Sequence, residues 1–114
     1  MRDDRERLAD ALEAIARIEK YAVQGRAAFE RDELLQNWIV RHLQILGEAC
    51  RGLSARIREE HSDIPWPNII GMRHILVHDY FGIDVDVVWR AVEHDLPPLK
   101  RQLQALLSDW PTTR

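Results

Sequence analysis

The sequence predicts an all-α fold, an antiparallel bundle of four to five helices, from three observations. Apolar residues recur at three- and four-residue steps along most of the chain, which is the period of a helix with one buried face. Glycine or proline interrupts this pattern between segments, so short connections are expected. The chain has 114 residues, of which 46% are hydrophobic and 31% charged. That size and composition predict one globular domain spanning residues 1–114.

The first helix is expected over residues 3–24, where Leu8, Leu12, Ile15 and Ile18 have helical spacing. Gly25 can end this helix because glycine readily adopts the left-handed conformation. A short connection over residues 26–31 should follow.

The second helix is expected to be long and unbroken over residues 32–60. Leu34, Trp38 and Ile45 widen its apolar face, which predicts burial against more than one neighbour, within the domain or across a dimer. Its main apolar stripe consists of Leu35, Ile39, Leu43, Leu46, Cys50, Leu53 and Ile57.

Prolines at positions 65 and 67 should separate this helix from a third one over residues 67–77. Asp84 is placed to cap the next helix, which Pro97 and Pro98 must kink or restart. No sheet is expected.

The four tryptophans are expected to be core or interface anchors; they are Trp38, Trp66, Trp89 and Trp110.

Composition also limits the classes of function. A formal net charge of −3 argues against broad affinity for nucleic acid, so any chemistry on RNA must use local positive charge. No apolar run approaches the ~20 residues that span a bilayer, and the charged N-terminus does not resemble a signal peptide. Cys50 is the single cysteine, which predicts no internal disulfide and a cytoplasmic location.

The segment Arg73-His74-Ile75-Leu76-Val77-His78-Asp79-Tyr80 has the clearest chemical character in the chain. An arginine can hold a phosphate, and an imidazole can move a proton at neutral pH. Together they suit a reaction on a phosphodiester that needs no metal and no cofactor. Arg73 and His78 lie about 140° apart around a regular helix. They can converge only if the helix ends or tightens near His78.

Two other interpretations of this segment stay open at this point. In the first, Arg73 pairs with a glutamate while His74 and Tyr80 simply pack in the bundle. In the second, His74 and His78, four residues apart on one helix face, bind a metal ion. The further ligands would come from His61, Asp79, Glu93 and His94, and nothing in the sequence selects among them.

The spacing Arg73-x4-His78-x-Tyr80 resembles the Arg-x4-6-His motif of HEPN domains, the helical ribonucleases of prokaryotic conflict systems. The tyrosine narrows the resemblance to the HepT-like toxins of type VII toxin–antitoxin systems, which pair with a minimal nucleotidyltransferase antitoxin. The resemblance extends over nearly the whole chain. It includes three further stretches: Ile45-Leu46-Gly47-Glu48-Ala49, Ile64-Pro65-Trp66 and Asp95-Leu96-Pro97-Pro98-Leu99.

The resemblance implies a metal-independent endoribonuclease that acts as a two-fold symmetric dimer, with two copies of the motif facing one cleft. His78 would take or give a proton, and Arg73 would stabilise the phosphate as its charge builds. His74 is a candidate for substrate contact or for a second proton carrier. Glu48 is expected to orient Arg73 or His78, and Asp79 is a candidate for substrate binding or for supporting the catalytic residues.

In this family the antitoxin transfers AMP groups to the motif tyrosine, here Tyr80. The added bulk and negative charge would exclude RNA. The expected partners are therefore RNA, a second copy of the chain and a nucleotidyltransferase antitoxin, with no membrane. A second functional class stays open, a non-catalytic HEPN module that only dimerises and binds a nucleotidyltransferase.

Overall fold

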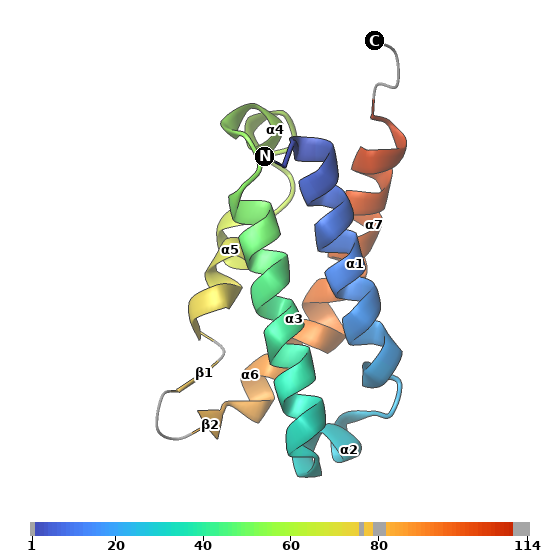
Figure 1. Cartoon of the computed structure of the whole chain (residues 1–114), viewed down its shortest axis with the longest axis vertical. Coiled ribbons are helices and arrows are strands. Elements are labelled where there is room, and N and C mark those ends of the chain that lie inside the picture. The colour runs from blue at the N-terminus through green and yellow to red at the C-terminus, as the bar shows by residue number, and fades with distance from the viewer. Residues whose placement is uncertain (1, 76, 79–81, 111–114) are drawn as a thin grey trace.

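The computed structural model describes residues 2–75, 77–78 and 82–110, which form an up-and-down bundle of helices (Figure 1). Helices α1 and α5 run in one direction and α3 and α7 in the other, which confirms the predicted antiparallel all-α bundle. The elements are α1 (Asp4–Ala22), α2 (Arg26–Arg31), α3 (Glu33–Arg51), α4 (Ala55–Glu60), α5 (Trp66–Ile75), β1 (Val77–His78), β2 (Gly82–Ile83), α6 (Val85–Arg90), the π-helical segment η1 (Ala91–Asp95) and α7 (Leu96–Ser108).

Helix α1 begins with a capping box. The Asp3 carboxylate accepts a hydrogen bond from the Glu6 backbone N–H at 2.8 Å, and the Glu6 carboxylate accepts one from the Asp3 N–H at 3.0 Å. Gly25 follows the helix with φ 91°, as its residue type predicted, but its ψ of 171° is extended. It therefore turns the chain into α2 instead of forming a left-handed helical cap.

The predicted connection over residues 26–31 is helical, and it forms α2. Phe29 explains why, because this side chain is fully buried and its ring centroid lies 5.4 Å from that of Trp89. A helical turn satisfies the backbone hydrogen bonds of the segment while directing Phe29 into the core. Asp32 then caps α3 by accepting hydrogen bonds from the N–H groups of Leu34 and Leu35.

The prediction of one continuous helix over residues 32–60 is wrong, because the segment is divided into α3 and α4. The Ser54 hydroxyl caps α4 by accepting a hydrogen bond from the Ile57 N–H. Asp4 in turn accepts hydrogen bonds from the Ser54 N–H at 2.9 Å and from the Ser54 hydroxyl at 2.7 Å. Leu53 and Ile57 remain buried across the break, so the apolar period continues although the helix does not.

The expectation of no sheet is wrong locally. β1 pairs with β2 in antiparallel orientation, with Val77 opposite Ile83 and His78 opposite Gly82. Two residues per strand form no layer, so the fold class remains all-α. Asp84 then caps α6, as predicted, by accepting a hydrogen bond from the Val87 N–H at 3.2 Å.

The proline pair explains the π-helical turn before α7. Pro97 and Pro98 have no N–H to donate to the carbonyls four residues earlier, so an α-helical ladder cannot continue through them. The Leu96 N–H instead bonds to the Ala91 carbonyl, five residues back. The predicted disturbance at this pair therefore takes the form of a widened turn that leads into α7.

Helix α3 is the centre of the packing, since it contacts both α1 and α5. Leu43 and Leu46 of α3 are fully buried. Trp66 and Trp89 are buried as predicted, whereas Trp38 and Trp110 are partly buried.

Among the helices of residues 2–75 and 82–110, none combines the length and the apolar character that crossing a bilayer requires.

Candidate functional site

The motif lies where α5 gives way to the short hairpin (Figure 1). Arg73 and His74 lie in the last turn of α5, and His78 lies in β1 opposite Gly82. Asp79 and Tyr80 lie outside the described residues, and so do the side chains of residues 73–82. The roles predicted for these five residues therefore stay predictions.

The end of α5 at Ile75 changes the geometry expected from the sequence. His74 and His78 do not share a helix face, because His78 lies in a strand. The angle of about 140° between Arg73 and His78 applied only to an unbroken helix. Arg73 and His78 could converge only if the helix ended near His78, and the backbone does end α5 before that residue.

Helix α5 is held firmly on its inner face. Trp66, Ile69 and Met72 are 2–5% exposed and lie at three-residue steps, so one face of α5 is buried up to the residue that precedes Arg73. The Trp66 indole N–H donates a hydrogen bond to the His61 carbonyl at 3.0 Å, which fixes the start of the helix. Packing against α3 therefore determines where the backbone of Arg73 lies.

Glu48 lies on α3 and is placed by two observations. Its carboxylate is 4.0 Å from the Arg51 guanidinium, and its side chain is 55% exposed. It also lines a hollow of about 470 Å³ between α1 and α3, together with Arg7 and Asp10. A contact of Glu48 with the side chain of Arg73 or His78 would involve atoms outside the described residues, so its orienting role stays a prediction.

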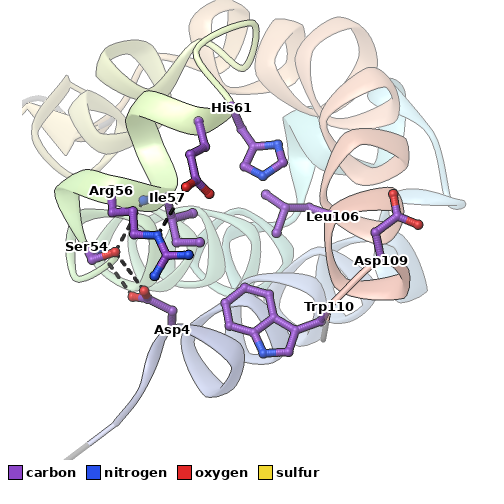
Figure 2. A pocket seen from close by; sticks show the side chains of 9 residues that line it. Asp4, Ser54, Arg56, Ile57, His61, Leu106, Asp109 and Trp110 are labelled. Atoms are coloured by element: carbon purple, nitrogen blue, oxygen red, sulfur yellow. Dashed lines mark hydrogen bonds and ion pairs between the residues drawn. The ribbon is translucent and has the colours of Figure 1, made fainter. Parts of the chain in front are cut away.

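A larger hollow lies at the end of the bundle away from the hairpin, where α1, α4 and α7 meet (Figure 2). It has a volume of about 680 Å³. Figure 2 shows Asp4 bonded to Ser54 on one side and Trp110 and Asp109 of the α7 end on the other, with Leu106 between them and His61. Its described lining residues belong to α1, α4, α7 and the residues next to these helices, and its polar groups at Asp4 and Ser54 already serve the cap of α4.

The described residues do not supply a metal centre. Among them, no three or more histidine, cysteine, aspartate or glutamate side chains are grouped to hold a metal ion. Of the proposed further ligands, His94 and Glu93 form an exposed pair at 3.5 Å, whereas His61 lines the hollow of Figure 2. The metal interpretation needs the side chains of His74 and His78, which lie outside the part of the chain that the structure describes.

The comparison with protein families identifies the scaffold. A family model described as "Ribonuclease HepT-like" matches residues 11–106, which include all of α3 and α5, the motif and most of α1 and α7.

The chain belongs to the HepT-like ribonuclease family.

Individual relatives agree with this assignment. A protein of Thermococcus cleftensis named "Probable ribonuclease HepT" is 36% identical over 108 residues, which cover 92% of this chain and 96% of the relative. The "mRNA nuclease HepT" of Shewanella oneidensis is 24% identical over 127 aligned positions, covering 90% of this chain and 95% of that protein. No solved structure matches the chain significantly. HepT-like membership confirms the predicted family and the predicted enzyme class, a ribonuclease.

Proposed function

We propose that this HepT-like chain is a metal-independent endoribonuclease toxin whose catalytic residues are Arg73 and His78. The observation that supports this most is the end of α5 between the two residues, within a family of ribonucleases. A helix end lets the backbone turn, so that an arginine and a histidine five positions apart can face one phosphate. A regular helix would hold them on different sides.

The reaction follows from the groups present. The 2′-oxygen of one nucleotide attacks the adjacent phosphorus, a new 2′-O–P bond forms, and the bond from phosphorus to the 5′-oxygen breaks. One proton leaves the 2′-hydroxyl and another reaches the departing 5′-oxygen. His78 serves one of these transfers, because an imidazole changes its charge near neutral pH. Arg73 offers its planar fork to the phosphate oxygens as negative charge builds.

Purified protein incubated with total RNA in EDTA tests this proposal. The parent should cleave, and His78→Ala should lose on the order of 10²-fold or more in rate because proton transfer is lost. Arg73→Lys should also be strongly impaired, since a point charge does not replace the bidentate fork. Loss of the parent's activity on chelation, or full activity of a variant changed at both residues, would show that the chemistry is different.

The proposed assembly is a homodimer. Leu34 on α3 is 81% exposed in the single chain, and Val23 at the end of α1 is 82% exposed. Trp38 and Ile45 of α3 are only partly buried. Apolar side chains on two neighbouring helices, left open in the monomer, suit a self-complementary contact. Sedimentation of the parent should give twice the mass of one chain, and a compact monomer that keeps its activity would contradict the dimer.

The proposed control is AMP transfer to Tyr80 by a minimal nucleotidyltransferase antitoxin in the cytoplasm. Each AMP adds a phosphate charge and a nucleotide, and both oppose RNA binding. Incubation with the partner and ATP should add multiples of the AMP mass to the peptide that contains Tyr80. Tyr80→Phe should remain toxic and resist neutralisation. Neutralisation with no added mass would mean that the partner inhibits by binding alone.

The alternative, a HEPN module without catalysis, predicts a different pattern in the same experiments. The protein would dimerise and bind the nucleotidyltransferase, yet leave RNA intact at every concentration. Growth arrest on expression would then be absent for the parent as well as for His78→Ala.

A further inference from the structure

A groove of about 400 Å³ lies between α5 and the α6–η1 segment, and the proposed reaction does not use it. Its apolar lining includes Met72 of α5, Val87 of α6 and Ala91 of η1. Among the described residues, its polar lining is formed by Asn68 of α5, Arg90 of α6 and Asp95 of η1. A volume of this size falls within the range of small-ligand sites, and the mixed lining suits a nucleotide.

Arg90 is the positively charged residue among those of the described chain that line the groove. Its side chain is exposed, and among the residues that the structure describes it has neither an ion pair nor a hydrogen bond. By contrast, Arg17 and Arg56 are each paired with a glutamate on their own helix. An unpaired guanidinium beside a concave surface is the group that binds phosphate most readily in proteins.

Asn68 faces the same groove from α5, and its amide has no hydrogen-bond partner within the described part of the chain. The apolar side is open as well, since Val87 is 39% exposed although it is a large hydrophobic residue. Gly71 of α5 borders open space in the groove, because a Cβ added there would meet nothing within 4 Å. The π-helical turn contributes Ala91 and Asp95 to the lining, and such turns are frequent at functional sites.

The groove adjoins the motif through the backbone of α5. Met72 lines the groove and directly precedes Arg73. Asn68 lies five residues before Arg73, roughly 7.5 Å along the helix axis. A nucleotide in the groove would therefore neighbour one whose phosphate lies at Arg73.

We infer that this groove is a nucleotide subsite for the RNA strand that flanks the scissile phosphate. Arg90 binds a flanking phosphate, Asn68 hydrogen-bonds the base or ribose, and the open apolar surface at Val87 packs against the base. The negative charge of Asp95 repels the phosphate and so limits the affinity of the groove for RNA. The inference rests on the proposed ribonuclease function and adds to it a substrate-binding residue, Arg90, outside the motif.

RNA binding by the inactive His78→Ala protein tests the groove separately from cleavage. A short fluorescent single-stranded RNA is titrated at several salt concentrations, and binding is followed by anisotropy. Adding Arg90→Gln should flatten the slope of log K against log salt by about 0.7, which is the value for one lost phosphate contact. Affinity at 0.1 M salt should fall by about five-fold, because a slope change of about 0.7 acts over the one decade of salt concentration below 1 M.

Two matched variants sharpen the result. Arg101→Gln makes the same charge change on α7, at another exposed arginine without an ion pair among the described residues, and it should leave slope and affinity unchanged. Asp95→Asn should tighten binding, and it removes no cap, since Asp95 makes no side-chain cap hydrogen bond to α7. All variants should keep the parent's melting temperature.

Two outcomes overturn the inference: no binding of RNA by the His78→Ala protein, or equal effects of Arg90→Gln and Arg101→Gln. Failure of the proposed function has a different signature. In that case the parent leaves RNA intact in EDTA, whatever the binding titrations show.

Discussion

Leu46→Ala should destabilise the bundle far more than the same substitution at Leu34 on the same helix. Leu46 is fully buried in α3, which packs against both α1 and α5, whereas Leu34 is 81% exposed. Removing a buried leucine side chain loses its transfer free energy and leaves a cavity, together about 3 kcal/mol. Leu34→Ala should cost below about 0.5 kcal/mol within the single chain.

The expected shift in melting temperature follows from the chain length. An unfolding entropy of about 2.1 cal/mol/K per residue gives about 0.24 kcal/mol/K for 114 residues. A loss of about 3 kcal/mol then lowers the melting temperature of Leu46→Ala by about 12 °C, and that of Leu34→Ala by at most about 2 °C.

Thermal unfolding followed by circular dichroism at two protein concentrations measures both variants. If Leu34 lies in the proposed dimer contact, the cost of Leu34→Ala should be larger at the higher protein concentration and shrink on dilution, whereas that of Leu46→Ala should not depend on concentration. Equal losses for the two variants at every concentration would refute the assignment of Leu46 to the core that supports α5.

Three further predictions concern the scaffold. Ser54→Ala should lower the free energy of unfolding in urea by about 1–2 kcal/mol, since the α4 cap and the bond to Asp4 are both lost, and Ser54→Thr should retain most of it. Gly25→Ala should cost about 1 kcal/mol or more despite open space at the site, because φ is 91° there. Burial raises the pKa of the Cys50 thiol to about 12, so the unfolded chain releases this proton first as pH rises. The contribution of Cys50 to the free energy of unfolding should be constant below about pH 9 and fall between pH 9 and 12. Urea midpoints measured against pH should show this fall for the parent, and Cys50→Ala should lack it.

Periodicity and capping residues were sufficient to predict the bundle. The stripe Leu8, Ile15 and Ile18 defined the buried face of α1, and Asp84 marked the start of α6. These features are predictable because each depends on a local pattern that the tertiary structure then reinforces.

The break between α3 and α4 escaped prediction because the apolar period continues across it. Leu53 and Ile57 stay buried on the expected face, so periodicity alone cannot distinguish one helix from two. Ser54 was the available signal, since serine favours the N-cap position. What stabilises the break there is Asp4, fifty residues away in sequence, and no local pattern reveals that contact.

The site shows a similar division. The motif was recognisable from residue types and spacing, but the change from helix to strand between Arg73 and His78 was not, because Ile75 and Val77 suit either structure. The groove at Arg90 was missed altogether. Its residues lie on α5, α6 and η1, and only the folded chain brings these elements together.

The central claim, phosphodiester cleavage by Arg73 and His78 without a metal, is tested most directly by the chemistry of the product ends. Purified parent protein and His78→Ala are each incubated with a defined RNA in EDTA, and the fragments are analysed by mass spectrometry. The proposed attack by the 2′-oxygen predicts a 2′,3′-cyclic phosphate on one fragment and a 5′-hydroxyl on the other, with both formed on the order of 10²-fold or more slowly by His78→Ala. Fragments that end in a 3′-hydroxyl and a 5′-phosphate, or intact RNA after treatment with the parent, would contradict the claim.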